Sequence, residues 1–229
     1  MSKHFNEDKI YFKYIEQIKK AKISNIDFIY QFPVYVGEVN IARLLFFYEM
    51  YQKTKSLSGH IADIGTWKGA SFFSFVKFVS LFEKNSQTLV YGFDWFKGMK
   101  PGKNDDDAHK GKYSANYKGI NNLLKLQGLD KIGKLQKMDL TKNFKDFLNK
   151  NKWLRFKLVF IDCGIEKVLK NTIPYVWSRM VKDGIIILDH YNAPWSPTES
   201  DILDKYIGKN KIQQLDFVRQ PTAFVQKKF

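Results

Sequence analysis

Short, continuously apolar segments separated by longer helix-like segments constrain the fold of this chain more than any other feature. Three of these segments read LVYGF, KLVFI and IIIL, and none shows strict alternation of apolar and polar residues. An unbroken apolar strand is buried on both faces, as in a parallel sheet that helices cover on each side. Because such strands alternate with helix-length segments, the sequence predicts an α/β, Rossmann-like, doubly wound fold with a mostly parallel sheet.

The apolar patterns also place the individual elements. Residues 8–22 and 38–53 show helical spacing, so we expect an N-terminal helical extension over residues 1–58 and an α/β domain over residues 59–229. We expect strands at 60–64, 88–93, 134–138, 158–161 and 184–188, and helices at 71–82, 117–127, 144–149 and 166–180. Two further candidates, 212–217 and 223–227, predict a C-terminal antiparallel hairpin.

A long polar and glycine-rich stretch, KGMKPGKNDDDAHKGKYSAN, occupies residues 97–116. A loop of this length in a compact domain is usually functional or disordered. It begins after the second expected strand, where ligands bind in open α/β sheets. We interpret it as a mobile lid, with a disordered insertion as the alternative. Its run of Asp105, Asp106 and Asp107 could bind a cation, but we favour a solvated charged segment.

Composition and charge argue against several classes of protein. No apolar run reaches the roughly 18 residues that span a bilayer, and the polar N-terminus lacks the apolar segment of a signal peptide. Cys163 is the single cysteine, so an internal disulfide is excluded. A cytoplasmic protein without a membrane partner is expected. The formal charge is +15, but only four of the 38 basic residues are Arg and the Lys residues are scattered, so nucleic acid binding is not favoured.

The first expected strand runs into a glycine-rich turn, IADIGTWKGAS. Gly65 permits a sharp turn, and Gly69 permits the close approach of a helix that begins near Ser71 and offers unpaired N–H groups. The spacing lacks the third glycine of the dinucleotide pattern G-x-G-x-x-G. Asp63 would repel a pyrophosphate and attract an ammonium group, so S-adenosylmethionine fits better than NAD. A turn that only packs its own strand and helix stays an open alternative.

Two further acids follow the second and third expected strands. Asp94 ends LVYGFD, where a carboxylate can accept both hydroxyls of a ribose. Asp139 follows KLQKM, where an adenine edge would lie. For each residue the alternative is a helix N-cap.

A second group of polar residues follows the fourth and fifth expected strands. Asp162 ends LVFID, and Asp189 and His190 end IIILDH. Adjacent parallel strands would bring the three side chains together. Two carboxylates favour Mg²⁺ or Mn²⁺, and the imidazole also admits Fe²⁺ or Zn²⁺. Such a cation would lower the pKa of an acceptor hydroxyl. The alternative is that both aspartates cap helices or contact the cofactor.

In combination, GHIADIGTWKGAS, VYGFDWFKGM, KYSAN, FIDCG and KDGIIILDHYN resemble class I S-adenosylmethionine-dependent methyltransferases over about residues 36–207. The sequence is most similar to the macrocin O-methyltransferase family of sugar methyltransferases and more distantly to catechol-type O-methyltransferases. The resemblance implies metal ligation by Asp162, Asp189 and His190 and places Arg43 near the active site. The expected cofactor-binding set is Asp63, Gly65, Thr66, Trp67, Gly69, Ser71, Asp94, Trp95, Asp139, Leu140 and Asp162.

The sequence departs from the family pattern at two positions. Gly164 stands where the family often has a second acid after the fourth strand, the proposed base. His190 stands where the family usually has an acidic metal ligand. His190, Asp162 and Arg43 are the expected catalytic residues. His190 is a candidate base if it is not a metal ligand, and His109 and Glu166 are further candidates.

We therefore predict an O-methyltransferase that acts on a hydroxyl of a small, sugar-like molecule, in an in-line displacement assisted by a divalent cation. An anionic group on this acceptor is compatible with the basic sequence. A homo-oligomer is compatible with the sequence. Two alternatives are an RNA methyltransferase, which the charge of +15 would suit, and an inactive cofactor-binding module, which Gly164 would suit. A dinucleotide-dependent oxidoreductase ranks behind both.

Overall fold

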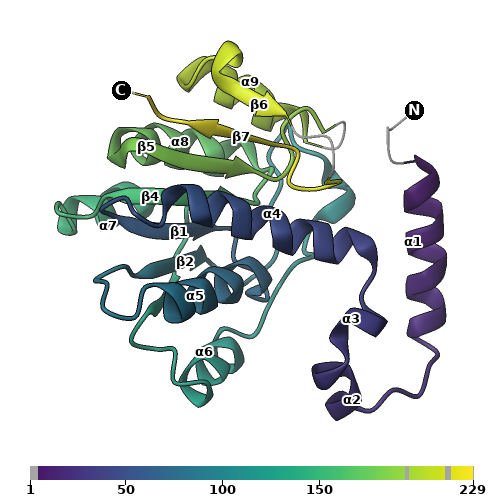
Figure 1. Cartoon of the computed structure of the whole chain (residues 1–229). Helices are drawn as coiled ribbons and strands as arrows, with labels where there is room; N and C mark the ends of the chain where they lie inside the picture. The colour runs from purple at the N-terminus through teal and green to yellow at the C-terminus, as the bar shows by residue number, and fades with distance from the viewer. Residues whose placement is uncertain (1–4, 194–195, 215–217, 229) are drawn as a thin grey trace.

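A seven-stranded sheet forms the centre of the molecule, in the order β3-β2-β1-β4-β5-β7-β6 (Figure 1). The computed structural model describes residues 5–193, 196–214 and 218–228. The strands are β1 (His60–Ile64), β2 (Val90–Asp94), β3 (Gly133–Lys137), β4 (Phe156–Ile161), β5 (Met180–Leu188), β6 (Ile212–Gln214) and β7 (Ala223–Gln226). The first five strands are parallel to one another, whereas β7 pairs antiparallel with both β5 and β6. The predicted fold class, including the C-terminal antiparallel pair, is confirmed.

The expected strand limits match the observed ones for β1 and differ by one to four residues for the other strands, with the larger differences in β2, β4, β5 and β6. The second strand begins at Val90, not at residue 88, and the fifth begins at Met180, four residues before the expected start. The strand expected at 212–217 is described only to Gln214, since residues 215–217 lie outside the described residues.

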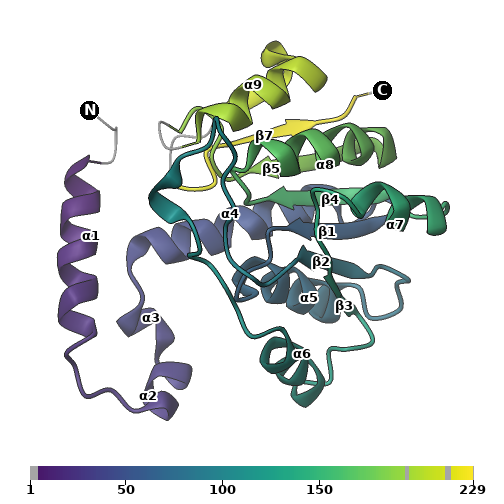
Figure 2. The same ribbon diagram turned by 180° about the vertical axis from the view of Figure 1, so that it is seen from behind.

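Helices cover both faces of the sheet (Figures 1 and 2). They are α4 (Glu38–Thr54), α5 (Ala70–Phe82) and α6 (Tyr117–Leu126) on one face, and α7 (Phe144–Lys150), α8 (Glu166–Arg179) and α9 (Pro197–Tyr206) on the other. Successive residues of β4 go to opposite cores, because Val159 packs with the α7–α8–α9 side and Phe160 with the α4–α5–α6 side. Burial on two faces explains why KLVFI shows no polar alternation.

Three N-terminal helices lie outside these two layers, namely α1 (Phe5–Ile18), α2 (Asn25–Tyr30) and α3 (Phe32–Tyr35). They flank the carboxyl ends of the parallel strands (Figures 1 and 2). The Tyr14 hydroxyl donates to the Tyr35 carbonyl at 2.7 Å, which ties α1 to α3. In contrast, α4 buries Phe46 and Met50 in the core of the sheet, so only α1–α3 stand apart from that core. No helix in the described part of the chain is long and apolar enough to cross a membrane.

The segment 97–116 folds back on itself and is attached to the domain. Lys97 and Ser114 form an isolated antiparallel β-bridge, and the Met99 N–H donates to the Lys112 carbonyl at 2.7 Å. Asp105 Oδ1 accepts from the Glu166 N–H at 2.8 Å, at the start of α8. The expectation that Asp105 belongs to a merely solvated charge run is therefore wrong, because its carboxylate anchors this loop.

Candidate active site

The glycine turn connects β1 to α5 by close contact with a neighbouring strand. Gly65 has φ +90°, and a Cβ built there would lie 2.1 Å from the Asp162 carbonyl oxygen. Gly69 has φ +93° and precedes the first residue of α5. Both backbone conformations lie in the left-handed region, which favours glycine. Gly65 thus lets the β1 turn lie directly against the end of β4, which brings the two halves of the expected site together.

Asp63 lies fully buried at the end of β1. Ser71 Oγ, from the first turn of α5, donates to Asp63 Oδ1 at 2.9 Å. Asp63 Oδ2 is buried and makes no hydrogen bond among the described residues. Burial raises the pKa of Asp63 to about 7, although the hydrogen bond from Ser71 opposes the shift. A buried carboxylate oxygen without a donor suits a ligand N–H, as expected for the amino end of the cofactor.

Asp94 ends β2 and holds two backbone groups in place. Its Oδ2 accepts from the Trp67 N–H at 2.8 Å and its Oδ1 from the Phe96 N–H at 2.6 Å. Burial raises its pKa above the ordinary value. Trp67 has φ +46°, and its indole N–H donates to the Ser114 carbonyl at 3.2 Å. Asp94 therefore fixes the glycine turn, and Trp67 joins that turn to the 97–116 loop.

The polar groups of the other expected cofactor residues bond to neighbouring parts of the chain. Asp139 Oδ1 accepts from the Thr141 N–H at 2.9 Å, so this oxygen stabilises its own turn. Leu140 is buried in the core, and the Trp95 indole N–H donates to the Gly98 carbonyl at 2.7 Å. Thr66 Oγ1 donates to the Asp63 carbonyl at 3.1 Å. Contact of these residues with the cofactor stays a prediction.

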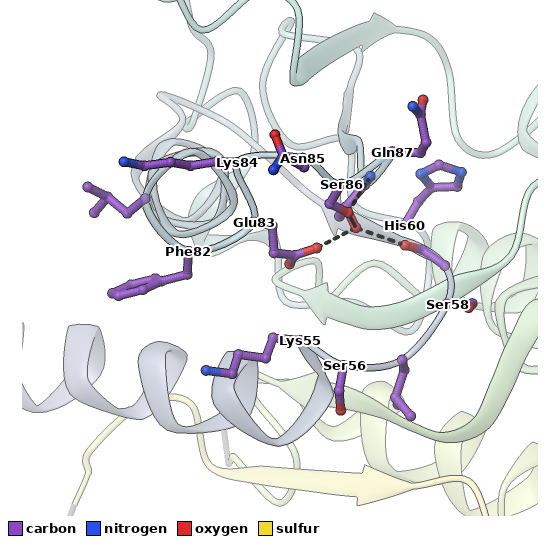
Figure 3. A pocket seen from close by; sticks show the side chains of 14 residues that line it. Lys55, Ser56, Ser58, His60, Phe82, Glu83, Lys84, Asn85, Ser86 and Gln87 are labelled. Carbon is purple, nitrogen blue, oxygen red and sulfur yellow. Dashed lines mark hydrogen bonds between the residues drawn. The ribbon is translucent and has the colours of Figure 1, made fainter.

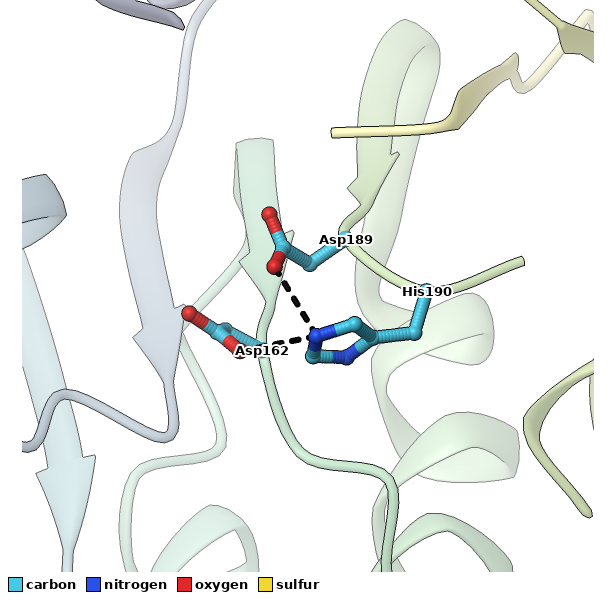
Figure 4. Close-up of side chains that lie close together, drawn as sticks. All are labelled: Asp162, Asp189 and His190. Carbon is cyan, nitrogen blue, oxygen red and sulfur yellow. Dashed lines mark ion pairs between the residues drawn. The ribbon is translucent and has the colours of Figure 1, made fainter. Parts of the chain in front are cut away.

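Asp162, Asp189 and His190 meet at the carboxyl ends of β4 and β5 (Figure 4). His190 Nε2 lies 3.1 Å from Asp189 Oδ2 and 3.8 Å from Asp162 Oδ1. One ligand atom from each residue lies within 4.8 Å of the other two. The strand order β4-β5 produces this meeting, since Ile161 and Leu188 are paired in register.

Arg43 reaches the same cluster from α4. Its Nη1 donates to Asp189 Oδ1 at 2.5 Å, and its Nη2 lies 3.4 Å from Asp162 Oδ2. The guanidinium also lies over the rings of Phe47 and Phe160, at 5.1 and 5.2 Å from their centroids. Burial alone would lower the pKa of Arg43, but Asp189 and Asp162 raise it above its ordinary value. Arg43 is thus a fixed cation beside the two carboxylates.

Burial and the mutual proximity of these groups alter their protonation. Burial alone would lower the pKa of His190, but Glu199, Asp189 and Asp162 raise it to about 9. Burial and the neighbouring Asp189 raise the pKa of Asp162. Side chains whose pKa values are shifted by burial and by a specific charged neighbour are typical of acid–base sites.

The donor set fits a divalent cation. A metal with bonds of about 2.1 Å places adjacent ligand atoms about 3 Å apart, close to the 3.1 Å between His190 Nε2 and Asp189 Oδ2. Arg43 pairs with Asp189 Oδ1, so Asp189 Oδ2 is the oxygen that faces His190 and the cluster.

Glu199 of α9 is a residue of the site that the sequence did not reveal. Its side chain is fully buried, and its Oε1 accepts from the His190 N–H at 3.3 Å. Its Oε2 lies 3.7 Å from His190 Nδ1. Its position nine residues after His190, in the polar run PTESD, gives no sign of burial.

Ser196 packs against the glycine at position 164. A Cβ built at Gly164 would lie 2.4 Å from Ser196 Oγ and 3.2 Å from Ser196 Cβ, so a larger residue there requires the Ser196 hydroxyl to turn away. The other candidate bases have partners of their own. Glu166, the first residue of α8, accepts from Asn104 of the loop and from Lys170 of its own helix, and His109 of the loop lies against the ring of Tyr113.

A hollow of about 800 Å³ lies at the opposite, amino-terminal edge of the sheet (Figure 3). Its wall contains Glu83, which pairs at 2.9 Å with the buried ammonium group of Lys157. That ammonium also bonds to Thr88 Oγ1 and the Lys55 carbonyl, so its donors are used within the protein. This hollow is separate from the acidic cluster.

Comparisons with known proteins agree with this geometry. The profile of a family described as a methyltransferase domain matches residues 62–191. No curated protein matches the chain significantly. Among solved structures, the calicheamicin methyltransferase CalS11 has a TM-score of 0.80 at 17% identity, covering 96% of this chain and 92% of that one.

Two further solved structures have a similar fold. The apo structure of CalS11, described as a TDP-rhamnose 3′-O-methyltransferase, gives a TM-score of 0.75 at 17% identity, covering 96% of this chain and 94% of that one. An O-methyltransferase from Bacillus cereus, in complex with S-adenosylhomocysteine (SAH), gives 0.54 at 11% identity, covering 93% and 89%.

The family match includes the glycine turn, Asp94 and the Asp162–Asp189–His190 cluster, and it spans more than half of the chain. With the doubly wound sheet and the orphaned carboxylate oxygen of Asp63, it identifies the chain as a member of the methyltransferase domain family, an S-adenosylmethionine-dependent methyltransferase.

Proposed function

We propose that the protein transfers the methyl group of S-adenosylmethionine to a hydroxyl of a small, sugar-like acceptor. One observation carries the proposal: the glycine turn lies against the end of β4, so the cluster of Asp162, Asp189 and His190 adjoins the expected site of the methyl donor. The likeness to a TDP-rhamnose 3′-O-methyltransferase supports a sugar-like acceptor, and the basic chain supports an anionic one.

The chain's own residues have separate roles in this reaction. Asp63 holds the amino end of the cofactor through its orphaned oxygen, and Asp94 holds the turn and the ribose. Asp162, whose side chain is 35% exposed, faces the acceptor and takes the hydroxyl proton, with Asp162 Oδ1 held 3.8 Å from His190 Nε2. Arg43 keeps the two aspartates in fixed positions.

The chemical balance of the reaction is simple. A bond forms between the acceptor oxygen and the methyl carbon as the bond from that carbon to sulfur breaks, and the hydroxyl proton passes to the protein and then to water. S-adenosylmethionine supplies the methyl group, and the products are the methyl ether, SAH and a proton. The protein contributes alignment of oxygen and carbon and exclusion of water.

We further propose that Asp162, Asp189 and His190 hold a divalent cation beside the acceptor. When bound, the cation supplies Lewis-acid assistance by lowering the pKa of the hydroxyl. The spacing of the three donors and their hard oxygen atoms support this assignment.

Methyl transfer from S-adenosylmethionine labelled in its methyl group tests the proposal. The acceptors would be nucleotide-linked sugars, free sugars, catechol and ribosomal RNA, each with and without chelator. We expect label in a sugar acceptor. Asp162→Asn should lower transfer about 10²-fold or more because it removes the proton acceptor, whereas Asp130→Asn, at an exposed turn, should leave it unchanged.

Label in RNA alone would reject the small acceptor. Absence of transfer together with absence of SAH binding would reject the activity itself. Transfer that chelator and Asp162→Asn leave unaffected would reject the role of the cluster.

A further inference from the structure

Glu199 is a buried carboxylate whose second oxygen has no hydrogen bond among the described residues. Its side chain has 0% exposure, and Oε2 is the oxygen that lacks a hydrogen bond there. A buried carboxylate costs several kcal/mol in desolvation unless a positive or donor group lies against it. The group opposite Oε2 is the Nδ1 atom of His190, at 3.7 Å.

Two contacts fix the carboxylate of Glu199 relative to the His190 ring. Oε1 accepts the backbone N–H of His190 itself at 3.3 Å, so the acid is attached to the residue whose ring it faces. The opposite ring nitrogen, Nε2, points at Asp189 Oδ2 and Asp162 Oδ1. The imidazole is thus placed between one carboxylate outside the cluster and two carboxylates inside it.

This order of groups is that of a metal-binding histidine. A ligating imidazole almost always donates its second N–H to a carboxylate or carbonyl, which fixes the tautomer and the ring orientation. A short movement of the ring would close the 3.7 Å separation to hydrogen-bond length and leave the Nε2 lone pair directed at the cluster.

We infer that Glu199 is the positioning residue that orients His190 as the nitrogen ligand of a divalent cation, with Asp162 and Asp189 as its oxygen ligands. The inference rests on the proposed cation site. It also implies a preference among metals: one imidazole with two carboxylates selects Mn²⁺ over Mg²⁺, because Mg²⁺ prefers oxygen ligands throughout.

Titration calorimetry of the full chain, saturated with SAH, against MnCl₂ and against MgCl₂ tests the inference. We expect Mn²⁺ to bind more tightly than Mg²⁺. Glu199→Gln should weaken Mn²⁺ binding 10- to 100-fold, as loss of such a partner typically does. Asp204→Asn is the matched control, since Asp204 lies on the same helix and accepts from the Tyr191 hydroxyl at 2.8 Å, away from the imidazole; we expect no change.

A double-mutant cycle separates orientation of the ring from charge and from structure. In a His190→Asp background there is no imidazole to orient, so Glu199→Gln should no longer weaken Mn²⁺ binding. This background also provides an answer if the single Glu199→Gln variant does not fold. SAH affinity is measured for every variant and should not change.

Three outcomes would overturn the inference. They are wild-type Mn²⁺ affinity in Glu199→Gln, an equal loss in the His190→Asp background, and absence of Mn²⁺ binding by the wild type. In each case intact SAH binding and intact methyl transfer would leave the proposed methyltransferase function standing, so the two failures are distinguishable.

Discussion

Gly65→Ala tests whether the contact between the glycine turn and the end of β4 requires a glycine at this position. The residue has φ +90°, and an added Cβ would lie 2.1 Å from the Asp162 carbonyl oxygen, an approach that real Cβ atoms do not make. The left-handed conformation costs roughly 1–2 kcal/mol for a residue with a Cβ. Relief of the clash by backbone shifts costs roughly 1–3 kcal/mol more. We therefore expect a loss of about 2–5 kcal/mol in the free energy of unfolding.

Gly128→Ala provides a matched control for the conformational part of that cost. Gly128 has φ +66°, and a Cβ built there meets no atom within 4 Å. Its substitution should cost only about 1–2 kcal/mol. In a chain of this size each kcal/mol lowers the melting temperature by about 2–4 °C, so Gly65→Ala should melt about 4–20 °C below the wild type.

Calorimetric melting and urea unfolding of both variants decide the matter. A Gly65→Ala variant that loses no more stability than Gly128→Ala would refute the close approach of β1 and β4. In that case the glycine would serve the cofactor alone, and SAH binding, measured below the melting temperature, would be the only property affected.

Three further results are expected. Glu83→Gln should cost about 3–5 kcal/mol in urea unfolding, because it leaves the buried Lys157 ammonium unpaired; Lys157→Met should cost less. Burial raises the pKa of Glu83, but Thr88 and Lys157 lower it below its ordinary value. The ionised Glu83 therefore stabilises the fold fully above about pH 4.3, and this stabilisation is lost at lower pH. A Glu83→Gln variant that loses as much stability in acid as the wild type would contradict this. Asp94→Asn should weaken SAH binding about tenfold in calorimetry, since the carboxylate fixes the Trp67 N–H.

The sequence predicted the parts of the site that depend on where each strand ends. Asp63, Asp94, Asp162 and Asp189 each follow or end an apolar run, and the carboxyl ends of parallel strands share one edge. Gly65 was predicted from the need for a sharp turn. Recognition of the strand–turn pattern was sufficient because these features are local in the chain.

Other features were decided only by tertiary structure. The buried Lys157 lies in a strand that reads as apolar, and its partner Glu83 is 74 residues away. Asp105 reads as part of a solvated charge run, yet it anchors its loop to α8 across 61 residues. Such pairings follow from which helix packs on which strand, and a pattern of hydrophobicity does not encode partners at that separation.

The arrangement of charges around the cluster is the clearest case. The sequence by itself determined a doubly wound sheet with acids at its carboxyl edge, because burial and turn chemistry act over short segments. Only the packing of α4 against β4 brings Arg43 to Asp162 and Asp189, which are 119 and 146 residues later. Only the packing of α9 buries Glu199 beside His190, since the charge that makes a side chain look exposed is stabilised there by a partner that folding supplies.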